Sequence, residues 1–291
     1  MSTPSRIPFP PSRLVRRVGC PFSDRRLQAE YDRRGRAVKA ALLDLLPGGW
    51  TWAGKRVLDF GCGSGRVLRH FVAEADGGGA EVWGCDVHEP SVRWVEANLC
   101  PPLRVVRNAP DPPLPMADGA FDLVWAVAVF THLTDSWSAW LLELHRVLAA
   151  DGLLIATFVG EGASADTLGA PWEEDRVGMN VLCCGRDWDS GGPLALHSSW
   201  WIGDHWGRAF DVVALQPAGF GGSGQGVALL RRKEVSLAPA DLERWSPGEP
   251  RELEALRYNR VQLERELTGL RATRSWRLTA PLRRLNSRRS R

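Results

Sequence analysis

Three glycines at alternate positions follow a short apolar segment and a carboxylate. The stretch over 59–66 reads DFGCGSGR, with Asp59 ahead of Gly61, Gly63 and Gly65. Glycine permits a tight turn and lets a ligand lie against bare main chain. The free N–H groups at the start of a following helix attract an anionic group. This segment therefore predicts a loop that binds a polar, charged ligand tail.

A second carboxylate, Asp86, stands at the end of the apolar run EVWGCD over 81–86. At the end of a second strand a carboxylate can accept hydrogen bonds from a ribose diol. Together with the glycine loop it predicts a site for a nucleoside cofactor with a polar tail. A nicotinamide oxidoreductase is the rival interpretation, but its dinucleotide-binding fingerprint would need a glycine at position 66. This chain has Arg66 there, which argues against that interpretation.

Alternating strands and helices must position these residues. Apolar spacing predicts an amphipathic helix over 25–46, ended by PGG, and further helices over 65–75, from Pro90 to 99 and after Asp135, which should cap its helix. Strands separated by helices imply right-handed βαβ units and a mostly parallel sheet with helices on both faces, an α/β fold. A long loop is expected over 160–195. The predicted strands are 56–60, 81–86, 103–106, 121–129, 153–158, 210–215 and 226–231.

Four blocks resemble the class I S-adenosylmethionine-dependent methyltransferases in order and spacing. They are VLDFGCGSGRVLR at 57–69, Asp86, LPMADGAFDLVWAVAVFTHL at 114–133 and LHRVLAADGLLIATF at 144–158, and they cover about half the chain. The resemblance implies a Rossmann-like methyltransferase fold with a seven-stranded sheet, S-adenosyl-L-methionine as cofactor, and methyl transfer as the activity.

The resemblance also implies roles for single residues. The loop residues would hold the aminocarboxypropyl end of the cofactor, Asp86 would hold the ribose, and the following segments would contact adenine and the sulfonium. Where the family often has Asp, this chain has Asn108, whose amide oxygen can still accept from the adenine amino group. The cofactor-binding residues implied are Asp59, Gly61, Cys62, Gly63, Gly65, Asp86, Val87, Asn108, Ala109, Ala126 and His132.

Transfer to an oxygen acceptor also needs removal of a proton, usually by histidine or a carboxylate. His132 follows the fourth predicted strand, at the edge where ligands bind in open α/β sheets. His197 opens the segment HSSWWIGDHW after the long loop. We expect His132 to shape the cofactor side of the pocket and His197 to be the base, with a packing role as the alternative for each. His70 and His145 fall inside predicted helices and are expected to be structural.

The tryptophan content and a narrower resemblance both bear on the chemical class of the acceptor. Five tryptophans, at 172, 188, 200, 201 and 206, fall in one stretch; indoles stack on sugar rings but also fill cores. The segments at 112–135 and 197–201, QPAGFGGSGQGVALLRR at 216–232 and TRSWRLTAPLRRL at 273–285 resemble methyltransferases associated with bacterial glycosyltransferases and surface-polysaccharide enzymes. This implies a hydroxyl of a glycan or glycosylated metabolite as acceptor. A small natural-product acceptor and a non-catalytic cofactor-binding scaffold remain the alternatives.

The chain is expected to comprise an extended arm over 1–24, a methyltransferase domain over 25–233, a linker over 234–250, and a helix with an Arg-rich tail over 251–291. Leucines at heptad spacing from 253 to 270 suggest contact with a glycosyltransferase or self-association through 251–272. Eight arginines after 270 suggest contact with an anionic membrane surface through 271–291, or a solvated tail; without them the formal net charge of +3 becomes −5. No nucleic-acid partner is expected.

Targeting and metal signals are missing from the sequence. The N-terminal segment has no apolar h-region, and no apolar run approaches the ~18 residues of a membrane span. The six cysteines form no C-x-x-C pair, so no metal site is expected. These features predict a cytoplasmic protein, with peripheral membrane contact through the tail as a further expectation.

Overall fold

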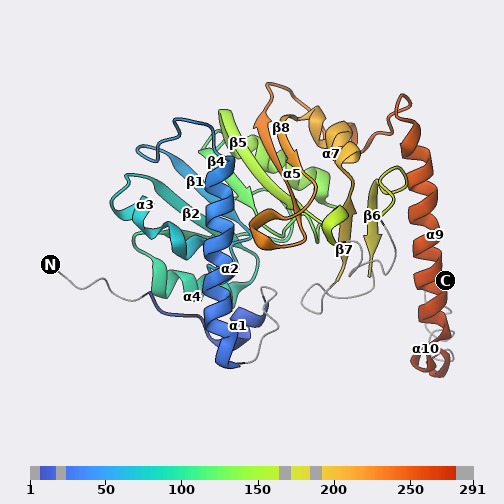
Figure 1. The fold of residues 1–291 in the computed structure, drawn as a ribbon, viewed down its shortest axis with the longest axis horizontal. Helices are drawn as coiled ribbons and strands as arrows, with labels where there is room; N and C mark the ends of the chain where they lie inside the picture. Colours follow the sequence, from blue (N-terminus) through green and yellow to red (C-terminus); the bar gives the residue numbers. More distant parts are fainter. Residues whose placement is uncertain (1–6, 18–23, 164–171, 184–191, 280–291) are drawn as a thin grey trace.

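The computed structural model describes residues 7–17, 24–163, 172–183 and 192–279, and its centre is a seven-stranded sheet (Figure 1). The strand order is β3-β2-β1-β4-β5-β9-β8. The first five strands of this order run parallel, whereas β9 is antiparallel to both of its neighbours. The predicted mostly parallel, seven-stranded sheet is confirmed. The strands are β1 Arg56–Phe60, β2 Glu81–Asp86, β3 Arg104–Arg107, β4 Phe121–Ala126, β5 Leu148–Phe158, β8 Phe210–Gln216 and β9 Gly226–Arg232.

Successive side chains of the central strands enter two different cores. Leu58 and Val124 pack on the face covered by α5 Trp137–Val147, whereas Val57 and Leu123 pack on the face covered by α2 Asp24–Leu45. Strand side chains alternate between faces, so runs that are apolar throughout, such as RVLDF, belong to strands buried on both sides. In Figure 1, α2 crosses in front of the sheet.

The helices on the α2 face differ from prediction in one place. The chain turns through 62–67 and first becomes helical in η1 Leu68–Phe71, which leads into α3 Val72–Asp76. A helix from 65 was wrong because Gly65 has a φ of +80°, in the left-handed region that a right-handed helix cannot use. The next helix, α4 Glu89–Leu99, begins one residue before Pro90. On the other face, Ser136 rather than Asp135 is the N-cap residue of α5.

The expected long loop over 160–195 contains two strands in its described parts. After η2 Glu161–Ala163, strand β6 Met179–Leu182 pairs antiparallel with β7 Leu194–His197. A bridge between Val159 and Leu196 joins β7 to the end of β5. The chain continues through α7 Ser199–His205, η4 Trp206–Arg208 and, between β8 and β9, η5 Phe220–Gly222.

The N-terminal arm is not extended throughout, because its described part contains the helix α1 Ser12–Arg17. Val15 of α1 is fully buried against Leu27 and Tyr31 of α2. This small apolar cluster fixes the two N-terminal helices to each other (Figure 1).

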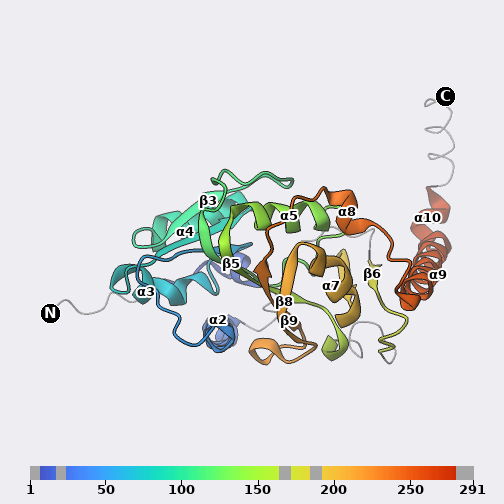
Figure 2. The same ribbon diagram turned by 90° about the horizontal axis from the view of Figure 1, so that it is seen from above.

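The predicted linker over 234–250 is also partly folded, since it contains α8 Pro239–Glu243, whose Leu242 is fully buried. It leads to α9 Pro250–Ala272 and α10 Arg274–Leu278. Figures 1 and 2 both show α9 at the outer edge of the molecule beside β6. There the side chains of Asn259 and Glu266 accept hydrogen bonds from the main-chain N–H groups of Val181 and Cys183, at 3.2 and 2.9 Å. Residues 280–291 of the tail lie outside the described residues.

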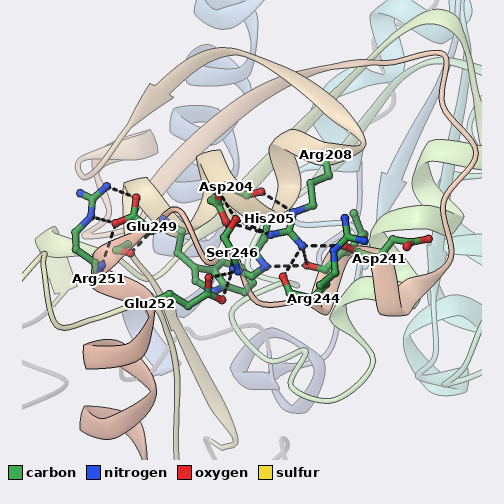
Figure 3. Close-up of polar contacts among 12 residues, drawn as sticks. Asp204, His205, Arg208, Asp241, Arg244, Ser246, Glu249, Arg251 and Glu252 are labelled. Carbon is green, nitrogen blue, oxygen red and sulfur yellow. Dashed lines mark hydrogen bonds and ion pairs between the residues drawn. The ribbon is translucent and has the colours of Figure 1, made fainter.

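A polar cluster holds the first turn of α9 against α7 (Figure 3). Glu252, 5% exposed, places one carboxylate oxygen 3.1 Å from Nε2 of His205 and accepts the N–H of Ser246 with the other. Asp204 accepts from the hydroxyl of Ser246 and from Arg208. Further along α9, the heptad positions Leu253, Leu256, Leu267 and Leu270 are exposed. No helix within the described ranges is long and apolar enough to cross a membrane.

Candidate functional site

A cavity of about 1010 Å³ lies at the carboxyl ends of β1, β2 and β4, and eight of the residues proposed for the site line it. Carboxyl ends of neighbouring parallel strands meet at one edge of a sheet, which is where open α/β folds bind ligands. The structure thus brings these eight residues together at that edge, and their role in binding stays a prediction. The eight residues are Asp59, Gly61, Cys62, Gly63, Asp86, Val87, Asn108 and His132.

The glycine loop follows β1 and depends on glycine for its shape. Gly61, Gly63 and Gly65 have φ values of +78°, +53° and +80°. The N–H groups of Gly61 and Cys62 both donate to the carbonyl of Cys85 at 2.9 Å, which ties the loop to the end of β2. A Cβ at Gly61 would lie 2.4 Å from Cγ2 of Val129, so no larger residue fits there. The main chain is therefore exposed directly to the cavity.

Asp86 at the end of β2 is held by two main-chain donors. One carboxylate oxygen accepts the N–H of Gly63 and the other accepts the N–H of His88, both at 2.8 Å. Each oxygen retains lone-pair capacity for a further donor. The side chain is 8% exposed and lines the cavity, so its fixed carboxylate can accept two neighbouring hydroxyls of a ligand.

Asp59 lies deeper, beneath the same loop. Its side chain is 3% exposed, and burial raises the pKa of its carboxyl to about 7. One of its oxygens, Oδ2, has no hydrogen-bond partner among the described residues. A buried acceptor without a donor is costly, so this oxygen is suited to a cationic ligand group such as an ammonium.

Asn108 provides a second unpartnered acceptor among the residues that line the cavity. Its amide nitrogen donates to the carbonyl of Ala109 at 2.8 Å, while its Oδ1 has no partner among the described residues. The side chain is 5% exposed and lies beside Val87 and Pro110 in the cavity wall. An amide oxygen next to apolar groups suits the amino-bearing edge of a purine.

His132 lies after β4, on the same cavity. Its Nδ1 is 2.9 Å from the carbonyl oxygen of Pro193, which can only accept a hydrogen bond. The proton of the neutral ring is therefore on Nδ1, and Nε2 carries a lone pair. This is the arrangement of a base that is oriented by a second group.

Four of the residues proposed for the site do not line the cavity: Gly65, Ala109, Ala126 and His197. His197 is fully buried between Trp201 and Trp206, with ring centroids 5.3 and 5.5 Å apart. Neither ring nitrogen has a hydrogen-bond partner among the described residues, and burial lowers the pKa of the imidazole to about 3. The assignment of His197 as the base gains no support from this position and stays a prediction.

The tryptophans of the 172–206 stretch likewise lie away from the cavity in the described part of the chain. Trp200, Trp201 and Trp206 are buried in the core on the α5 face, whereas Trp140, from α5 itself, lines the cavity. Trp188 lies outside the described residues.

Two groups of cavity residues were missed in the sequence. The first consists of Arg16 and Arg17 from α1 and Arg33 and Arg34 from α2; the second is the glycine-rich loop over 220–225. For the first group, Arg34 and Val38 are one helical turn apart, and both line the cavity. That spacing was visible in the sequence, but which face of the helix would meet the site was not.

Residues 58–156 match the family described as Methyltransferase domain. The 2-methyl-6-phytyl-1,4-hydroquinone methyltransferase of Synechocystis sp. is 33% identical over 115 residues, which are 39% of this chain and 33% of that protein. The chain thus matches about a third of the length of this curated relative.

Solved structures share the fold. A Pyrococcus horikoshii protein superposes with a TM-score of 0.51 at 18% identity, over 70% of this chain and 92% of that one. A putative S-adenosylmethionine dependent methyltransferase from Listeria monocytogenes superposes with a TM-score of 0.52 at 16% identity, over 69% and 99%. The predicted Rossmann-like methyltransferase fold is confirmed.

Proposed function

We propose that this chain, whose residues 58–156 match a methyltransferase domain and whose fold is that of S-adenosylmethionine-dependent methyltransferases, transfers the methyl group of that cofactor to an acceptor hydroxyl. The observation that carries the proposal is that one cavity holds Asp59, Asp86, Asn108 and the oriented His132. A glycan or glycosylated metabolite is the first candidate for the acceptor. The hydroquinone named in the Synechocystis relative makes a small aromatic acceptor the alternative.

The residues present fit this cofactor at three separate points. Asp59 Oδ2 would accept from the ammonium of the methionine end, Asp86 from the two ribose hydroxyls, and Asn108 Oδ1 from the adenine amino group. Such donors would satisfy the two oxygens that have no partner among the described residues. A cavity of about 1010 Å³ lies at the upper end of the range for small-molecule sites, which leaves room for an acceptor beside the cofactor.

When bound, the cofactor supplies a methyl group already activated by its positively charged sulfur. The chain aligns the acceptor oxygen behind that methyl and excludes water, an effect worth on the order of 7–11 kcal/mol. His132 would accept the proton of the acceptor hydroxyl on its Nε2 lone pair. The hydrogen bond from Nδ1 to Pro193 keeps the ring in the tautomer that this step requires.

The test separates cofactor binding from transfer. S-adenosylhomocysteine binding is measured by calorimetry, and transfer is measured with methyl-labelled cofactor and a panel of glycan extracts, glycosides and hydroquinones. We expect His132→Ala to lower kcat by about 10²–10⁴-fold while the affinity for S-adenosylhomocysteine changes only a few-fold.

Two outcomes would contradict the proposal. Tight binding of S-adenosylhomocysteine without transfer to any acceptor would favour the non-catalytic scaffold. Loss of turnover in a folded His197→Phe variant, with His132→Ala active, would move the base to His197.

Two finer expectations for the C-terminal end remain proposals. The exposed leucines of α9 support self-association or contact with a glycosyltransferase through 251–272. The arginines of 271–291 support contact with an anionic membrane surface.

A further inference from the structure

A buried histidine and two carboxylates come together where the first turn of α9 packs against α7 (Figure 3). Asp204 and His205 are the last two residues of α7, and Glu252 lies in the first turn of α9. Nε2 of His205 is 3.1 Å from Oε1 of Glu252 and 3.8 Å from Oδ2 of Asp204. The three residues each offer one ligand atom, and these atoms all lie within 4.8 Å of one another. One nitrogen and two oxygens therefore face a common space.

The hydrogen bond of His205 leaves its second ring nitrogen with a lone pair. Nδ1 is 2.7 Å from the carbonyl oxygen of Leu242, which can only accept, so Nδ1 carries the proton of the neutral ring. Trp201 stacks on the imidazole, with 4.3 Å between the ring centroids, and the side chain of His205 is only 3% exposed. Nε2 has no hydrogen-bond partner among the described residues. A buried nitrogen lone pair facing a carboxylate oxygen is unfavourable unless a proton or a cation lies between them.

The remaining atoms of the two carboxylates are already engaged. Oε2 of Glu252 accepts the N–H of Ser246 at 2.7 Å, which leaves Oε1 directed toward His205. Asp204 accepts from the hydroxyl of Ser246 with Oδ1 and from Arg208 with Oδ2, both at 3.1 Å. Such outer contacts hold metal ligands in a fixed orientation. Arg208 balances one of the two carboxylates, so one negative charge of this cluster is left for a cation.

We propose that His205, Glu252 and Asp204 bind a divalent transition-metal ion such as Zn²⁺, which fastens α9 to α7. Zinc binds imidazole nitrogen and carboxylate oxygen at about 2.0–2.2 Å in a tetrahedral arrangement, and this sets neighbouring ligand atoms about 3.3 Å apart. The two distances from Nε2, 3.1 and 3.8 Å, lie on either side of that value. A proton could join Nε2 to one carboxylate only, whereas an ion engages all three ligands.

The site is separate from the cavity, because none of its three ligands is among the described residues that line the cavity. Its fourth coordination position is left to water, and Asp204, 29% exposed, lies on the side open to solvent. No metal site was expected from the cysteines, but these ligands are a histidine and two carboxylates. Glu252 follows His205 only after two strands and a further helix, so no short spacing motif shows the site in the sequence.

The experiment uses the full chain after treatment with a chelator, with Zn²⁺ alone as the probe. Affinity is measured by competition with a chromophoric chelator, and Tm is measured with and without the ion. We expect the wild type to bind one Zn²⁺ with a Kd below about 10 μM and to gain about 5 °C or more in Tm at about 100 times that Kd. His205→Gln and Glu252→Gln should each weaken the affinity at least about tenfold, whereas Glu254→Gln, from the same helix, should change it less than about twofold.

Asp204→Asn keeps the test decisive if the two buried variants do not fold, because Asp204 is partly exposed. This variant should also weaken Zn²⁺ binding about tenfold, and it should alter the visible absorption of Co²⁺ bound in place of Zn²⁺. No binding of Zn²⁺ to the wild type would overturn the proposal and leave a proton between His205 and Glu252. Equal affinities in Asp204→Asn and Glu254→Gln would overturn it as well. Neither measurement uses methyl transfer, so the outcome is independent of the proposed function.

Discussion

Replacing Asp59 by asparagine should stabilise the cofactor-free protein, and increasingly so as the pH rises. Burial raises the pKa of this carboxyl from 3.8 to about 7. The folded protein therefore holds the proton more tightly than the unfolded chain does. The stability this contributes is fully present below the unfolded pKa and is lost as the pH rises through about 7. Asparagine has nearly the same shape and does not ionise.

The size of the effect follows from the two pKa values. Each pKa unit corresponds to about 1.4 kcal/mol, so the full difference is about 4 kcal/mol. Some of this stability has already been lost at about pH 5.5, and the wild type loses a further ~2 kcal/mol between about pH 5.5 and pH 8.5. The stability advantage of Asp59→Asn over the wild type should grow by this amount across that interval. In a chain of this size it corresponds to about 4–8 °C in Tm.

Urea unfolding of the cofactor-free proteins at these two pH values measures the difference. The same variant should bind S-adenosylmethionine more weakly at about pH 8.5, because the neutral amide cannot pair with the ammonium of the ligand. A stability difference that is the same at both pH values would refute the reasoning, since it would mean that Asp59 does not change its charge over that range in the folded protein.

Two further substitutions test contacts outside the ionisation of Asp59. Gly61→Ala should lower the free energy of unfolding by about 2–4 kcal/mol, because it adds a clash with Val129 to the strain of a positive φ. Gly49 also has a positive φ, +85°, but nothing lies within 4 Å of its added Cβ, so Gly49→Ala should lower the free energy of unfolding by only about 1 kcal/mol. Equal losses in the two variants would exclude the clash. Glu252→Ala should cost about 1–3 kcal/mol in urea unfolding, because it removes the buried acceptor of the Ser246 N–H. Glu254→Ala, from a half-exposed position on the same helix, should cost under about 0.5 kcal/mol, and a Glu252 variant as stable as the Glu254 variant would contradict this.

The strands of the sheet were predictable because their signal is local. RVLDF and EVWGCD are apolar runs bounded by turn residues, and the structure has strands with those same bounds. The glycine loop and Asp86 were found for the same reason, since their meaning depends on position relative to those strands. The helix after the loop was misplaced because three glycines with positive φ lengthen the turn, and residue types alone do not show where the turn ends.

Other features depend on contacts between segments that are distant in sequence. Val181 of β6 and Cys183 just after it donate their main-chain N–H groups to the side chains of Asn259 and Glu266, which lie 78 and 83 residues later in the chain. No local sequence pattern predicts such contacts. His197 was proposed because it opens the segment HSSWWIGDHW after the long loop, yet it packs between two indoles that come later in the chain. The arginines of the cavity wall were visible in the sequence, but the direction in which α2 presents them depends on the hydrogen bond from the Tyr31 hydroxyl to the carbonyl oxygen of Ser64.

Helix α2 approaches the glycine loop so closely that a Cβ at Gly35 would lie 2.1 Å from the carbonyl oxygen of Arg66, and this has a consequence for protein engineering. The first helices cannot be grafted onto another methyltransferase domain as an independent module, because their seating requires a residue without a side chain at one position and a bare carbonyl at the other. Any chimera that includes these helices would have to include both Gly35 and the turn around Arg66.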